Sequence, residues 1–195
     1  MRTPPRTLIG ALAAVLAALA LSACGNSHSK VTTGTYAGES GANAPYLNVG
    51  PLIYEVQLSR QLNPTNSEDA SYLQGLGAAE SKLEPGEEWF AVSMQVYNNG
   101  KHSERAAETM TISDTAGNVY APIVPNPINA YAYRGGVIAP KGQIPSPDTT
   151  AFLGATQGEV LVYKIKISSL NNRPLQIKIT NPEDLAESAS AELDV

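Results

Sequence analysis

The chain has 195 residues, of which 18 are acidic and 13 basic, with a formal net charge of −5. Binding to nucleic acid or to an anionic membrane surface rewards clustered Lys and Arg, so this acidic balance argues against both. It contains one cysteine and two histidines, which leaves little material for a metal site of the Cys and His type.

The N-terminus has a basic, then apolar, then small-residue pattern. Arg2 and Arg6 precede a nearly uninterrupted apolar run over residues 8–21, which is short for a membrane span of about 20 residues. The run ends in Leu21-Ser22-Ala23-Cys24. This ending resembles the lipobox of bacterial lipoproteins. The resemblance implies cleavage between Ala23 and Cys24 and a lipid on the Cys24 sulfur, which would place the protein on the extracytoplasmic face of a cell membrane.

Cysteine usage agrees with lipidation. Cys24 has no partner for an intramolecular disulfide, and an exported protein would otherwise carry a free thiol. Two or three acyl chains would hold the protein stably on a bilayer. The alternative is an ordinary secretory peptide that happens to end beside a cysteine.

Composition divides the chain into four segments. Residues 1–23 are the signal peptide, and residues 24–45, rich in Gly, Ser, Thr and Asn, are expected to form a flexible tether. Residues 46–182 have the size of one domain. Residues 183–195 are expected to form an acidic tail that is frayed or briefly helical.

Within the domain, apolar and polar residues alternate with the period of two that is typical of strands. The segments are 52–59, 89–97, 110–113, 118–121, 136–139, 159–168 and 175–179, with a further short strand expected near 149–153. Asn66 to Leu73 offers a capping residue and acids in the first turn, which predicts one short helix in a connection. The spacing of the predicted strands indicates an all-β sandwich with one solvated face on each sheet.

Four motifs occur in this order: Val92 to Gly100, which ends in Asn-Asn-Gly; Ile112 to Tyr120, which contains Asp-Thr-Ala-Gly; Ile138 to Gly142, which contains Pro-Lys-Gly; and Gly158 to Ile165. Together they resemble the immunoglobulin-like DUF4352-type domain of secreted proteins and lipoproteins of Gram-positive bacteria. The resemblance covers residues 50–180 and implies an immunoglobulin-like antiparallel β-sandwich outside the cytoplasm. It supplies no catalytic residues, and Tyr163 departs from the Phe that is usual in such domains.

Each candidate catalytic or metal-binding residue has a structural explanation. His28 lies in the expected tether and His102 just after a turn, and neither has metal ligands at suitable spacing. Adjacent Glu87 and Glu88 would point to opposite faces of a strand, so they would not converge. Asp114 is expected to form a turn rather than to bind calcium. The sequence therefore predicts no cofactor, no metal site and no enzymatic activity.

The proline-rich segment 120–158 contains the candidate binding loop. Tyr131, Tyr133 and Arg134 have the composition of interface anchors, which predicts contact with a partner such as an envelope protein. The alternative is that the two tyrosines cover an open sheet edge. The overall hypothesis is a membrane-anchored, non-enzymatic binding module. A small solute- or ion-binding lipoprotein that assists a transporter is the alternative, although 172 residues are few for the usual two lobes.

Overall fold

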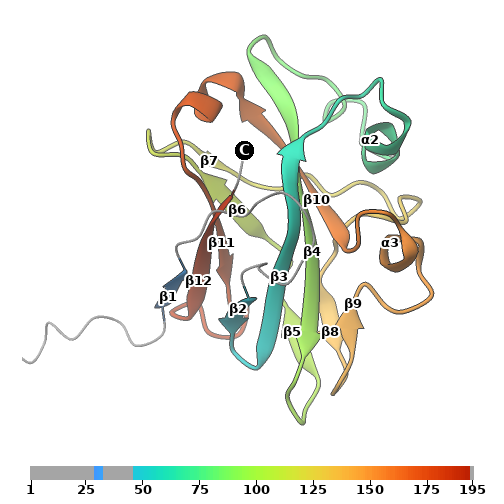
Figure 1. Cartoon of the computed structure of the whole chain (residues 1–195), viewed down its shortest axis with the longest axis vertical. Coiled ribbons are helices and arrows are strands. Elements are labelled where there is room, and N and C mark those ends of the chain that lie inside the picture. The colour runs from blue at the N-terminus through green and yellow to red at the C-terminus, as the bar shows by residue number, and fades with distance from the viewer. Residues whose placement is uncertain (1–28, 33–45, 194–195) are drawn as a thin grey trace, which may run out of the picture.

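The computed structural model describes residues 29–32 and 46–193, which form a β-sandwich with two short α-helices (Figure 1). The elements are β1 (Ser29–Thr32), β2 (Tyr46–Val49), β3 (Leu52–Gln61), α2 (Ser67–Tyr72), β4 (Glu87–Asn98), β5 (Glu104–Ala106), β6 (Met110–Ser113), β7 (Val119–Tyr120), β8 (Gly136–Ile138), β9 (Gln143–Ile144), α3 (Thr150–Leu153), β10 (Glu159–Lys166), the 3-10 helix η2 (Ile167–Asn171), β11 (Leu175–Thr180) and β12 (Ser188–Leu193). The predicted all-β, immunoglobulin-like antiparallel sandwich is confirmed, with two α-helices instead of one.

Two five-stranded sheets face each other. One has the order β1-β12-β11-β6-β7, and the other has β10-β4-β3-β2 with β9 added beside β4. A separate ribbon pairs β5 with β8. We call the end formed by residues 50–51, 98–103 and 181–187 the loop end; it lies at the bottom of Figure 1, opposite the β6–β7 turn and η2. In the part of the chain that the structure describes, no helix is long and apolar enough to cross a bilayer.

The main core lies between the sheets and follows from the predicted alternation. On β4, Phe90, Val92, Met94 and Val96 are fully buried, as are alternate residues of β10 and β11. Burial of each such side chain stabilises the fold by about 1.5–3 kcal/mol. The predicted alternation of these strands is therefore confirmed, except at Ile167 of the predicted segment 159–168, which is exposed because β10 ends at Lys166.

Buried tyrosines fix the connection from β5 to β6 against the core. The Tyr54 hydroxyl accepts a hydrogen bond from the backbone N–H of Ala107, and the Tyr133 hydroxyl donates one to the carbonyl of Ala107, both at 2.8 Å. The Tyr163 hydroxyl donates to the carbonyl of Met110 at 2.9 Å. Burial raises the pKa of Tyr54 to about 12, so it stays neutral throughout the physiological range. These bonds satisfy backbone groups that would be costly to bury unpaired.

The outer face of the β10-β4-β3 sheet is covered, contrary to the expectation of one solvated face per sheet. Val160 and Val162 are buried there in a second hydrophobic cluster with Trp89 and Tyr72. Leu58 also lies on this face, beside Tyr72, although unbroken alternation over the predicted segment 52–59 would place it on the same face as Leu52. A β-bulge between Val56 and Leu58 supplies the reason, because one extra residue reverses the alternation beyond it.

The segment near 149–153 is helical, so the strand predicted there is wrong. The Thr149 hydroxyl accepts a hydrogen bond from the N–H of Phe152 at 3.3 Å and caps α3. A capping side chain offers the backbone an alternative to strand pairing.

The predicted tail and tether also contain strands. β12 lies within the predicted tail 183–195 and pairs antiparallel with β11, because Ala189, Ala191 and Leu193 alternate into the core. β1 lies within the predicted tether 24–45 and pairs in parallel with β12, with Ser29 opposite Ser188. The tail and tether predictions are wrong for these residues. Ala23, Cys24 and His28 lie outside the described residues.

Asp114 forms the predicted turn between β6 and β7. Its Oδ1 accepts hydrogen bonds from the backbone N–H groups of Ala116 and Asn118. Its Oδ2 accepts one from the side-chain Nδ2 of Asn118. Burial alone would raise the pKa of the Asp114 carboxyl. Hydrogen bonds from Ser169, Asn118 and Asn172 outweigh burial and lower the pKa to about 2.

We expect Asp114→Asn to lower the free energy of unfolding by about 2 kcal/mol at pH 7. The folded pKa is below the unfolded value, so the stabilisation is present above pH 4 and is lost as the pH falls toward 2. The difference in the free energy of unfolding between Asp114→Asn and the wild type should therefore be smaller at pH 2. Urea titrations at both pH values measure it, with the exposed Asp148→Asn as control. An equal difference at both pH values would contradict the prediction.

Candidate functional site

The three residues of the predicted binding loop all make contacts within the sandwich. The Tyr133 side chain is buried in the main core, with 2% of its surface exposed. Tyr131 packs edge-on against Tyr72, with ring centroids 5.2 Å apart. The Arg134 Nη2 donates to the carbonyls of Pro125 and Asn126 at 2.9 and 2.6 Å. Tyr133 is too deeply buried to contact a partner, so the prediction is wrong for this residue. Tyr131 and Arg134 are half-buried, and for them contact with a partner stays a prediction.

These residues cover a sheet edge, which was the alternative explanation. The N–H of Tyr133 donates to the carbonyl of Val160 at 3.0 Å, and the N–H of Val160 donates to the carbonyl of Tyr131 at 2.7 Å. The N–H of Ile123 donates to the carbonyl of Val162. Residues 123–133 therefore pair with backbone groups of Val160 and Val162 on the outer edge of β10.

Asn129 connects this loop to α2. It is buried, and its Nδ2 donates to the carbonyls of Ser71, Tyr72 and Gln74 at the end of the helix. Its Oδ1 accepts from the N–H of Tyr131. This role of Asn129 was not predicted from the sequence. An Asn between apolar residues in a proline-rich loop could have indicated it, because Asn side chains in loops favour hydrogen bonds to backbone groups.

Glu159 begins β10 beneath the same loop. Burial raises the pKa of its carboxyl to about 7, and the backbone N–H and the guanidinium of Arg134 offset only part of that effect. The neutral acid is thus favoured in the folded protein up to neutral pH.

We expect Glu159→Gln to stabilise the protein at pH 8 and to leave its stability unchanged at pH 4. The pKa of Glu159 in the folded protein is above its unfolded value. The contribution of the neutral Glu159 carboxyl to stability is therefore fully present below pH 4.5 and is lost as the pH rises through 7. Because the side chain is only partly buried, the gain at pH 8 should be about 1–2 kcal/mol. Thermal unfolding across this range measures it, with the exposed Glu84→Gln as control. No gain at pH 8 would contradict the prediction.

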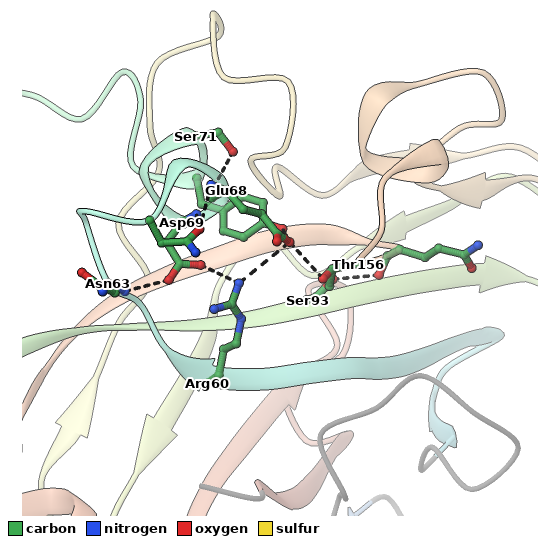
Figure 2. A network of polar contacts seen from close by, with 10 residues as sticks. Arg60, Asn63, Glu68, Asp69, Ser71, Ser93 and Thr156 are labelled. Carbon is green, nitrogen blue, oxygen red and sulfur yellow. Dashed lines mark hydrogen bonds and ion pairs between the residues drawn. The ribbon is translucent and has the colours of Figure 1, made fainter.

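A polar network attaches α2 to the sheet (Figure 2). The Arg60 Nη2 on β3 lies 2.5 Å from Asp69 Oδ1 and 3.8 Å from Glu68 Oε1. Asp69 is 2% exposed, and its Oδ2 accepts from the N–H of Asn63 at 2.7 Å. Glu68 and Asp69 are the acids of the first turn that predicted the helix, and their ion pair with Arg60 was not predicted from the sequence.

Glu68 extends this network to a second loop. Its Oε1 accepts from the hydroxyls of Tyr72 at 2.7 Å and Thr156 at 3.3 Å. Burial, together with the Glu68 carboxylate, raises the pKa of Tyr72 to about 12, so Tyr72 remains a donor. The cavity beside the network has about 10 Å³, which is at most enough for one water molecule. We interpret the network as structural, since it leaves no room for a substrate.

The loop end contains the better candidate site, a cleft of about 290 Å³ between the β2–β3 turn, β5 and the β11–β12 connection. Its polar side chains are Glu104, Arg105, Asn181, Glu183, Asp184 and Glu187. The Asn181 Nδ2 donates to Glu187 Oε2 at 2.8 Å, which fixes the wall of the cleft. A groove of about 400 Å³ adjoins it, shares Arg105 and Pro182, and includes the exposed Leu185.

The chemistry of the cleft is that of an acidic surface. Four carboxylates face a single arginine, so the cleft can accept hydrogen bonds and disfavours anionic ligands. Within residues 29–32 and 46–193, no group of three His, Cys, Asp or Glu side chains has the geometry to hold a metal ion. His102 is exposed in the β4–β5 loop, where its carbonyl accepts from Asn98. Residues 183–187 belong to the segment predicted to be a tail, so the cleft was not predicted from the sequence.

The fold has relatives among solved structures. They include the yjhA protein of Bacillus subtilis, which is 13% identical, with a TM-score of 0.50 over 80% of this chain and 99% of that chain. A β-sandwich protein of Clostridium difficile is 10% identical, with a TM-score of 0.43 over 80% and 93%. A Bacillus subtilis protein described as a candidate lipoprotein, ycdA, is 10% identical, with a TM-score of 0.46 over 76% and 38%. At these identities the likeness concerns the fold alone.

No family model matches the chain, and no curated protein sequence is similar to it. The DUF4352 resemblance therefore stays a prediction, while the β-sandwich fold is established.

Proposed function

We propose that the protein is a lipid-anchored lipoprotein on the extracytoplasmic face of a cell membrane and that its sandwich is a non-enzymatic binding module. The observation that carries the anchor is Leu21-Ser22-Ala23-Cys24 directly after an apolar run of secretory length. The sandwich supports a binding role because its loops form an open cleft on a rigid core.

Mass spectrometry of the mature protein tests the anchor. We expect the N-terminal residue to be Cys24, with a diacylglycerol thioether on its sulfur, and we expect the protein to partition into detergent. Cys24→Ser should abolish both the lipid and the partitioning. A mature wild-type protein that is released with an unmodified thiol would refute lipidation.

Crosslinking in living cells tests the binding module. A photoreactive residue at Asp184, in the cleft, should capture a defined partner, whereas the same residue at Ala116, in the β6–β7 turn at the opposite end, should not. Equal capture at the two positions, or at neither, would count against binding through the cleft.

The transporter-linked alternative has a separate test. A cleft of about 290 Å³ is at the small end of the range for ligand pockets. We expect no metabolite or metal in a panel to raise the melting temperature. A rise of several degrees that Asp184→Asn abolishes would instead favour a solute- or ion-binding lipoprotein.

A further inference from the structure

The strand β1 relates the sandwich to the anchor point. β1 runs parallel to β12, and Ser29 pairs with Ser188, the first residue of β12 after the 181–187 connection. The start of β1 therefore lies at the loop end of the sandwich, and both strands run from there toward the opposite end (Figure 1).

The distance from this point to Cys24 is limited by the chain itself. Five residue steps separate Cys24 from Ser29, and fully extended chain covers at most about 18 Å over that number. Without β1, the first paired residue would be Tyr46, 22 steps from Cys24, with a maximum reach of about 79 Å. Pairing of β1 with β12 thus shortens the reach of the anchor about fourfold.

We propose that β1 docks the lipid-bearing end of the chain on β12 and so holds the loop end, with its acidic cleft, toward the membrane. This inference rests on the proposed lipid anchor. It makes the cleft accessible to membrane-bound partners and directs the β6–β7 turn away from the bilayer. The length of β12, about 20 Å, separates the two ends along the direction of the strands.

The pairing of β1 supplies the variant that tests the orientation. Lys30→Pro together with Val31→Pro removes two adjacent N–H donors of β1, one of which is placed to pair with β12. The same two prolines at Gly38 and Glu39 serve as the matched control, because these positions lie outside β1. Neither pair changes residues 46–193, so the sandwich should fold in both variants.

The experiment uses the mature lipidated protein in vesicles with a short-range energy acceptor on the outer-leaflet headgroups. A dye is placed on Glu183→Cys at the loop end or on Ala116→Cys at the opposite end; both positions are exposed, and the lipidated Cys24 does not react. We expect strong energy transfer at 183 and weak transfer at 116. The prolines at 30 and 31 should reduce the transfer at 183 and the difference between the ends, whereas the control prolines should not.

Two results would overturn the proposal. One is equal transfer at 183 and 116 in the wild type, and the other is unchanged transfer at 183 with the prolines at 30 and 31. A wild-type protein found in the supernatant, with no transfer at either position, would refute the lipid anchor itself. Sedimentation of the vesicles distinguishes that failure from a failure of the orientation.

Discussion

Arg60→Met is expected to lower the free energy of unfolding by about 3 kcal/mol, because it leaves the Asp69 carboxylate buried without its cation. Arg60 Nη2 is 2.5 Å from Asp69 Oδ1, and the Asp69 side chain is only 3% exposed. Methionine retains most of the apolar stem of arginine, so the loss of stability measures mainly the removal of the charge. At this chain length the melting temperature should fall by about 6–12 °C, measurable by calorimetry.

The matched control for this variant is Arg105→Met. Arg105 pairs with Glu108 at 2.9 Å, but both side chains are about half exposed, at 48% and 60%. Exposed pairs contribute about 0–1 kcal/mol, so the control should be nearly neutral.

A double variant separates the charge of Asp69 from its packing. Adding Asp69→Asn to Arg60→Met should recover part of the stability, since an amide oxygen can still accept from Asn63 without burying a charge. Equal losses in Arg60→Met and Arg105→Met would contradict a buried ion pair.

Much of the fold could be predicted from alternation. The strands β4, β10 and β11 bury every second side chain in the main core, and Asn66 caps α2 by accepting from the N–H groups of Glu68 and Asp69. These features depend on residues close together in the chain. Local pattern was sufficient for them.

The features that were missed depend on distant residues. Val160 and Val162 alternate like outward-facing residues, and they are buried because α2 and residues 123–133 cover them. β12 is built from Ala and Ser, whose alternation is too weakly apolar to predict a strand without its neighbour β11. Such burial follows from tertiary packing and not from local propensity.

The candidate site shows the same limit. Tyrosine is common both at interfaces and in cores, so the composition around Tyr131 and Tyr133 could not distinguish them. The buried hydrogen bond from the Tyr133 hydroxyl to the Ala107 carbonyl shows that Tyr133 is a core residue. The acidic residues 183–187 had been assigned to a tail, and they line a cleft only because β12 returns the chain to the sheet.

Gly158 lies where the loop after α3 enters β10, and it has a φ of +116°. A Cβ at this position would lie 2.5 Å from Ser93 Oγ and 2.9 Å from the carbonyl oxygen of Met94. Ser93 cannot rotate away without cost, because its hydroxyl donates to the carbonyl of Gln157 at 2.8 Å. The position therefore combines backbone strain with a steric clash in the packed interior.

We expect Gly158→Ala to lower the free energy of unfolding by about 3 kcal/mol, of which strain and overpacking each supply a part. Gly86→Ala is the matched control: its φ is +84°, but a Cβ there would meet no atom within 4 Å. The control should lose only about 1 kcal/mol, from strain alone. Adding Ser93→Ala to Gly158→Ala should restore part of the difference, because it removes the nearest clashing atom. Urea titration of the four proteins measures these values, and equal losses for the two glycine variants would show that the loop entering β10 adapts freely.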